Sequence, residues 1–156
     1  MLRVRPKQHG FSLMEVLVAL LILSIGLLGL AGLQTRGIQM NHSAHLASQA
    51  NYLGYDILDR MRSNREVAIS GGYNRRLNDG PPAGDSIAAQ DVREWLLGIL
   101  GDEERGGLLP QEGNATGAAI NVDNNGRATV TISWLDARWT EDEDERIRTI
   151  IIQSQL

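Results

Sequence analysis

The chain has 156 residues, with 19 Asp or Glu against 15 Lys or Arg, so its net charge is −4. This length suits one small domain with an anchor segment, and the acidic balance argues against the generic basic surface of a nucleic-acid-binding protein. The sequence contains no cysteine, so disulfides are excluded and a folded domain must rely on packing alone.

The N-terminal region combines a basic leader with a long apolar run. The first ten residues carry Arg3, Arg5 and Lys7 and no acidic residue. Val16 to Leu33 follows with 18 residues that lack any charge. As a helix this run spans roughly 27 Å, which is close to the hydrocarbon thickness of a bilayer. The basic leader predicts that the N-terminus stays in the cytoplasm and that the C-terminal side crosses the membrane.

Glu15 lies directly before this apolar run. An ionised carboxylate at membrane depth is costly and needs a partner. A conventional secretory signal has a shorter apolar region with its cleavage motif after it. Here the candidate cleavage position, Gly10-Phe11, precedes the run, so processing would leave the anchor on the mature chain.

Residues Lys7 to Leu17, KQHGFSLMEVL, resemble the class III signal of type IV pilins and type II secretion pseudopilins. The resemblance implies that a prepilin peptidase cuts between Gly10 and Phe11, that Phe11 is methylated as the new N-terminus, and that Glu15 becomes the fifth mature residue. In that family the glutamate acts in subunit assembly, and it could face the α-ammonium of Phe11 from a neighbouring subunit. An unprocessed single-pass anchor is the alternative. Beyond the leader, 12 basic and 19 acidic residues give a charge of −7.

The apolar helix is predicted to continue as an amphipathic one. From Ala44 to Met61, apolar residues recur every three or four positions, at Leu46, Ala50, Leu53, Ile57 and Met61. Asp56 and Arg60 are spaced for a small stabilising pair on the polar face. We therefore expect one helix from Ser12 to about Arg62, roughly 75 Å long. Its N-terminal half must be surrounded by membrane in the free subunit and by other helices in an assembly.

Three glycines, Gly26, Gly29 and Gly32, lie near the outer end of the apolar run. They either form a smooth face for close helix packing or let the helix unwind locally on leaving the bilayer. Packing is the preferred interpretation.

Ser63 to Gly84 is rich in Gly, Asn, Arg and Pro and is predicted to be a long connecting loop. Asp85 or Ser86 is expected to cap a second helix, which Gly101 ends. The apolar side of that helix is predicted to consist of Val92, Trp95, Leu96, Ile99 and Leu100.

The remaining sequence predicts an antiparallel sheet. Two alternating runs flank the turn sequence Asp123-Asn124-Asn125-Gly126: Ala118, Ile120 and Val122 before it, and Val130, Ile132 and Trp134 after it. A three-residue loop with Gly126 in the left-handed conformation pairs Val122 with Ala128 and places both apolar sets on one face. Arg146 to Gln153 is predicted as a third strand. Its run of isoleucines indicates burial on both faces or pairing in an assembly.

Candidate catalytic and ligand-binding groups are few. His42 and His45 share a helix face but have no nearby acidic or cysteine ligand in the sequence, so metal binding is not expected. The run Glu141 to Glu145 lacks the alternating ligands and glycine of a calcium loop and is predicted to be a solvated loop. Hydrolase, P-loop and zinc-protease motifs are missing, so no enzyme activity and no cofactor are predicted. A basic concentration, either exposed charge or a pilus-tip or DNA contact, is formed by Arg60, Arg62, Arg65, Arg75 and Arg76.

The predicted fold is α+β and pilin-like, with a long N-terminal helix packed on a small antiparallel sheet and one extra short helix. The predicted segments are a leader at 1–10, a transmembrane helix at 11–33, an amphipathic continuation at 34–62 and a globular region at 63–156. Residues 20–34, LLILSIGLLGLAGLQ, are similar to the type IV pilus modification family (PilV type).

That similarity implies a minor pilin that primes or modifies pilus assembly. The alternatives are a type II secretion pseudopilin and a pilus-tip module for adhesion or DNA uptake. The implied partners are prepilin peptidase, other minor pilins, the major pilin, the inner-membrane assembly machinery and, before assembly, the lipid bilayer. The implied location is the inner membrane, with the C-terminal domain periplasmic, and then the pilus at the cell surface.

Overall fold

The computed structural model describes residues 10–102, 104–111, 115–136 and 146–156. The leader before Gly10 and the acidic run from Glu141 to Glu145 lie outside the described residues. The chain divides into two compact units, one ending at Asn41 and the other running from His42 to Leu156.

The first element, α1, is a helix from Leu13 to Ser63, as the hydrophobic pattern predicts. Up to Asn41 its apolar side chains are exposed, whereas the later part packs into the second unit. There the predicted stripe is confirmed, because all five of its residues are buried: Leu46, Ala50, Leu53, Ile57 and Met61.

Helix α3 runs from Ile87 to Leu100 and begins and ends where the sequence predicts. The Ser86 hydroxyl accepts a hydrogen bond from the Ala89 amide at 3.2 Å, which caps the first turn. Gly101 ends the helix with a φ of 77°, a value that glycine adopts without steric cost. The indole Nε1 of Trp95 donates to the Leu53 carbonyl at 2.8 Å and so fixes α3 against α1.

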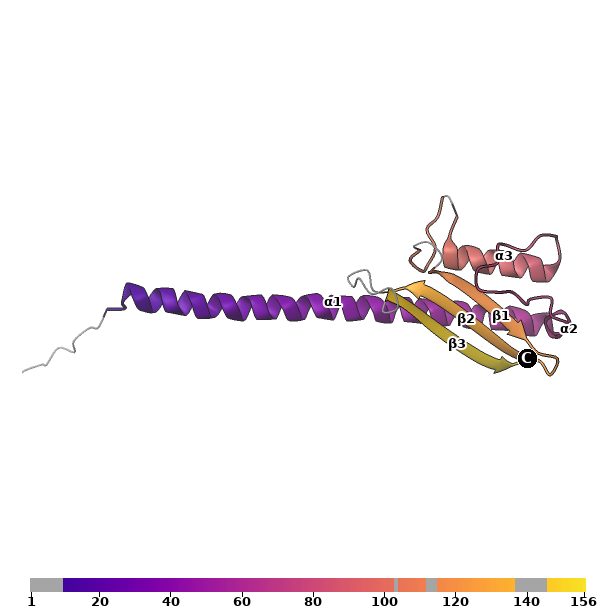
Figure 1. The fold of residues 1–156 in the computed structure, drawn as a ribbon, viewed down its shortest axis with the longest axis horizontal. Coiled ribbons are helices and arrows are strands. Elements are labelled where there is room, and N and C mark those ends of the chain that lie inside the picture. Colours follow the sequence, from indigo (N-terminus) through magenta and orange to yellow (C-terminus); the bar gives the residue numbers. More distant parts are fainter. Residues whose placement is uncertain (1–9, 103, 112–114, 137–145) are drawn as a thin grey trace, which may run out of the picture. The chain divides into compact units, whose positions relative to one another are not determined.

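Strands β1 (Gly117–Val122), β2 (Arg127–Leu135) and β3 (Ile147–Gln155) form an antiparallel sheet in the order β1-β2-β3 (Figure 1). The predicted hairpin register is confirmed, with Val122 opposite Ala128 and Ile120 opposite Val130. Gly126 has a φ of 78°, as the three-residue loop requires. The sheet packs on α1 at Gly54, where an added Cβ would meet the side chains of Ile132 and Ile152.

Two predictions for the second unit need correction. The segment predicted as one loop from Ser63 to Gly84 contains a short helix, α2 (Arg65–Ile69), and Arg75 forms a β-bridge with Ile120. Local Gly and Pro content did not reveal this, because the bridge depends on a strand far along the chain.

The third strand was also predicted imperfectly. It begins at Ile147 and ends at Gln155, and within the described residues it is not buried on both faces. Ile150 and Ile152 are partly buried against the core, but Ile147 and Ile151 on the other face are 42% and 64% exposed. Strand β3 is therefore an edge strand with one buried face.

The observed architecture agrees with the predicted pilin-like α+β fold. It combines a long N-terminal helix, a small three-stranded antiparallel sheet and short helices.

Candidate functional site

The start of α1 carries the predicted processing and assembly residues. The Ser12 carbonyl accepts hydrogen bonds from the amides of Glu15 and Val16 at 3.0 and 3.3 Å, and the Ser12 hydroxyl accepts from the Met14 amide at 3.3 Å. Ser12 thus caps the helix, and Glu15 lies in its first turn. A carboxylate in this position interacts favourably with the positive end of the helix dipole.

Glu15 was predicted from the sequence, but the capping role of Ser12 was not. The signal was available, because Ser12-Leu13-Met14-Glu15 fits the capping-box pattern of Ser followed three residues later by Glu. This cap explains why the helix begins directly after Gly10-Phe11. It leaves that dipeptide outside the regular helix, with Phe11 85% exposed.

The apolar side chains that follow are uncovered. Helix α1 is the one described helix that is long and apolar enough to cross a membrane, with a mean hydropathy of 2.7 over its most apolar window and none of that window buried. Leu20, Leu23 and Leu27 remain more than half exposed. Exposed apolar surface on this scale needs lipid or other helices around it.

The three glycines of the apolar run leave α1 continuous. Apart from its two neighbours in the chain and the nearby backbone of α1 itself, a Cβ added at Gly26, Gly29 or Gly32 would meet no atom within 4 Å. The single chain therefore shows no packing need for these glycines, and a close contact with another helix stays a prediction.

The predicted basic concentration is neutralised in part, at Arg60 and Arg62. Arg60 forms ion pairs with Asp56 at 3.1 Å, with Asp91 at 3.3 Å and with Glu94 at 2.8 Å. The hydrogen bond to Glu94, followed by the charge of Asp56, raises the Arg60 pKa against an opposing effect of desolvation. Sequence spacing predicted the Asp56 pair alone, since Asp91 and Glu94 come from α3.

The other arginines of this group do not gather into one open basic surface. Arg62 pairs with Asp59 at 2.6 Å, and Arg75 is directed into the protein, where its Nε donates to the Ala118 carbonyl at 3.1 Å. Burial lowers the pKa of the Arg75 guanidinium. Arg65 and Arg76 are exposed. This arrangement favours structural roles for Arg60, Arg62 and Arg75 over a nucleic-acid contact.

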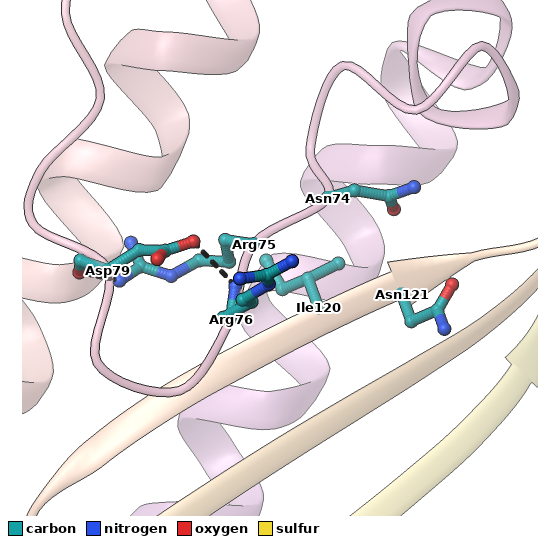
Figure 2. A pocket seen from close by; sticks show the side chains of 6 residues that line it. All are labelled: Asn74, Arg75, Arg76, Asp79, Ile120 and Asn121. Carbon is teal, nitrogen blue, oxygen red and sulfur yellow. Dashed lines mark hydrogen bonds between the residues drawn. The ribbon is translucent and has the colours of Figure 1, made fainter.

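A shallow groove of about 380 Å³ lies beside β1 (Figure 2). It is lined by Asn74, Arg75, Arg76, Asp79, Ile120 and Asn121. The Asp79 carboxylate accepts from the Arg76 amide at 2.7 Å and so holds the turn that forms one wall. Of the groove's polar groups, the oxygens of Asp79 and the Nε and Nη2 of Arg75 are used in shaping this segment.

The other candidate ligands are dispersed. His42 and His45 are exposed on α1. Among residues 10–102, 104–111, 115–136 and 146–156, no group of three or more His, Cys, Asp or Glu side chains is placed to hold a metal ion.

Comparison with known families gives a match that falls on the N-terminal region. Residues 5–31 match the family described as the prokaryotic N-terminal methylation motif. The motif indicates a type IV pilin-like or pseudopilin precursor. The motif implies processing by prepilin peptidase and assembly into a pilus or pseudopilus. It therefore points to a structural protein. No match was found among curated proteins or among solved structures.

The matched region contains all the residues predicted for processing and assembly, namely Gly10, Phe11 and Glu15. The motif and the exposed apolar helix fit anchoring in the membrane followed by incorporation into a filament. The roles assigned to the three residues individually stay predictions.

Proposed function

We propose that this chain is a minor pilin of a type IV pilus, similar to the pilus modification type. After cleavage between Gly10 and Phe11 and methylation of Phe11, it co-assembles with other minor pilins to prime or modify the filament. The observation that carries the proposal is the start of α1, where Glu15 lies in the first turn of a helix whose next 18 residues are uncharged and uncovered.

The physical role of Glu15 follows from this position. Cleavage would create an α-ammonium at Phe11, next to the helix N-terminus, where the dipole disfavours a positive charge. Both this ammonium and the Glu15 carboxylate are costly in hydrocarbon unless they are paired. Helices stacked with an axial offset bring the ammonium of one subunit to Glu15 of the next. That pairing would drive the subunit from the bilayer into the filament.

Replacing Glu15 tests this role directly. We expect Glu15→Ala to be inserted and processed normally but to be lost from sheared filaments, as measured by immunoblotting of membrane and filament fractions. Glu15→Asp is the matched control, because it keeps the charge and should restore part of the incorporation. Normal incorporation of Glu15→Ala would overturn the role assigned to this carboxylate.

Deletion of the whole chain distinguishes the function from its alternatives. A minor pilin that primes assembly predicts loss of surface pili while the major pilin is still made. Loss of protein secretion with intact pili would instead identify a pseudopilin. Normal piliation with lost attachment or DNA uptake would identify a binding module at the tip.

A further inference from the structure

The two edge strands of the sheet differ in how their outer hydrogen-bonding groups are used. Because the strand order is β1-β2-β3, one side of β1 and one side of β3 have no neighbouring strand in the sheet. An edge strand presents a row of backbone N–H and C=O groups to which another strand can pair.

The outer edge of β1 is closed by the segment Asn74–Leu77. Figure 2 shows Asn74 and Arg75 beside β1. The segment binds the N–H and the C=O of every second residue of the strand, through its backbone and through the side chains of Asn74 and Arg75. The bonds join Ala118 N to Leu77 O (3.2 Å), Arg75 Nε to Ala118 O (3.1 Å), Ile120 N to Arg75 O (3.0 Å), Arg75 N to Ile120 O (2.9 Å), Val122 N to Asn74 Oδ1 (2.7 Å) and Asn74 Nδ2 to Val122 O (3.4 Å).

The outward groups of β3 can be assigned from its pairing with β2. The Asp136 amide donates to the Arg146 carbonyl at 2.8 Å, and the Leu156 amide donates to the Gly126 carbonyl at 2.9 Å. Hydrogen-bonded pairs alternate along an antiparallel ladder, so the even-numbered residues between these two bonds face β2. The odd-numbered residues direct their N–H and C=O groups away from the sheet: Ile147, Thr149, Ile151, Gln153 and Gln155.

This second edge is open in the part of the chain that the structure describes. No described residue forms a hydrogen bond with the backbone N–H or C=O of Ile147, Thr149, Ile151 or Gln153. Strand β3 has little of the usual protection of edge strands, since its nine residues include no proline and its pairing with β2 is uninterrupted. Its one charged residue, Arg148, forms an ion pair with Asp136 at 3.3 Å. On the face of β3 that points away from the core, the side chains of Ile147 and Ile151 are exposed.

We infer that the outer edge of β3 binds an extended strand of a neighbouring subunit with a different sequence. Main-chain hydrogen bonds to Ile147, Thr149, Ile151 and Gln153 supply the pairing, and an aliphatic side chain of the partner strand covers Ile151. The inference deepens the proposed function and rests on it for the identity of the partner, because a minor pilin meets other pilins in its assembly.

A second copy of this chain fits the edge poorly. Its β1 edge is closed, so only its own β3 could pair with β3. An antiparallel pair of β3 strands would also make the two copies of residues 42–63 run in opposite directions. Subunits that enter one membrane with the same orientation instead reach the filament pointing the same way. A parallel pair would need the two strands staggered by an odd number of residues, because only odd-numbered groups face outward in both copies, so the two copies could not be related by a twofold axis.

Proline at Ile151 tests the backbone pairing. The amide of Ile151 faces outward, so Ile151→Pro removes a group needed by the partner strand and spares the bonds to β2. We expect Ile151→Pro to be processed and inserted at the parental level and to be lost from filaments. Ile151→Ala keeps the amide and should retain part of the incorporation. Ile150→Pro is the contrasting variant, since it removes a bond to β2 and should reduce the amount of folded subunit.

Photo-crosslinking identifies the neighbour without depending on the proline variant. A photoreactive amino acid at Gln153 in the full chain, expressed in piliated cells, should form an adduct with a strand of another prepilin-like subunit. Combining it with Thr149→Pro should abolish that adduct. The same amino acid at Ile87, which is 65% exposed on α3, is the control for nonspecific capture.

The outcomes separate the two proposals. An adduct with a second copy of this chain, or no adduct in cells with normal pili, overturns the strand pairing. Full incorporation of a folded Ile151→Pro chain does the same. If cells that lack the chain still form normal pili, while the adduct forms in cells that contain it, the priming function is wrong and the open edge stands.

Discussion

Tyr73 shows how one polar group joins three segments of the second unit. It is 1% exposed, its hydroxyl donates to Asp91 of α3 at 2.5 Å, and it accepts from the Asn64 side chain at 3.2 Å. Tyr73→Phe leaves both partners without this hydroxyl, so we expect a loss of about 1–2 kcal/mol in the free energy of unfolding. Thermal unfolding of the full chain in detergent measures the change, and an unaltered midpoint would contradict it.

The same residue predicts a pH dependence. Burial, followed by the hydrogen bond to Asp91, raises the pKa of Tyr73 from 10.0 to about 12. In the unfolded chain the phenol loses its proton near pH 10, so its stabilising contribution is complete below pH 10 and is lost between about pH 10 and 12. The two-unit shift corresponds to about 2–3 kcal/mol. Unfolding measured from pH 8 to 11.5 should show this decline in the parent chain and a flatter profile in Tyr73→Phe.

At the residue scale, positions governed by local rules were predictable. Ser86, one of two candidates for the helix cap, and Gly101 were identified as helix signals. The left-handed conformation of Gly126 was predicted because both strands of the hairpin must bury the same face. The partners that α3 supplies, Asp91 and Glu94 for Arg60 and Asp91 for Tyr73, were not predictable, because they depend on how the helices dock. Ser12 was missed although its pattern is local.

The closure of β1 by a loop residue leads to a prediction at the scale of elements. Asn74 takes the place of a partner strand, since its side-chain oxygen accepts from the Val122 N–H and its side-chain nitrogen donates to the Val122 C=O. Asn74→Ala leaves these groups open, so we expect local stability to fall by about 1–2 kcal/mol and the Val122 amide to exchange faster with solvent. Asn121→Ala is the matched control, because Asn121 is an exposed neighbour on β1. Equal exchange rates in both variants would contradict the role of Asn74.

The elements themselves were predictable where one periodicity extends over many residues. The stripe from Leu46 to Met61 and the alternation in the hairpin determine which face is buried, and that face fixes both α1 and the β1–β2 register. Segment 63–84 and the isoleucine-rich third strand were harder. Bridge formation by Arg75 requires knowing where β1 lies, and the sequence Ile150-Ile151-Ile152 does not tell an edge strand from a central one.

On the scale of the whole molecule, the chain leaves two surfaces that call for different neighbours. Residues 16–33 expose apolar side chains, which lipid or other helices can cover. The edge of β3 exposes backbone groups, which lipid cannot satisfy and another strand can. The packed core between α1, α3 and the sheet needs neither. The second unit therefore has its own buried core, whereas the apolar run and the β3 edge are left uncovered, which agrees with a function in assembly.

The mature N-terminus shows whether the apolar run stays on the protein. If residues 1–10 are removed, the mature chain begins at methylated Phe11 and keeps the whole apolar run, so it should remain in the membrane fraction after an alkaline wash. Intact-mass spectrometry of the purified chain would show the loss of the leader and the addition of one methyl group. Gly10→Val is the matched control, because it should block cleavage and leave a longer, unmethylated chain that is still membrane-bound. A mature chain that begins beyond Leu33 and appears in the soluble fraction would instead show that the apolar run is a removable secretory signal, and the assembly role of Glu15 would be wrong with it.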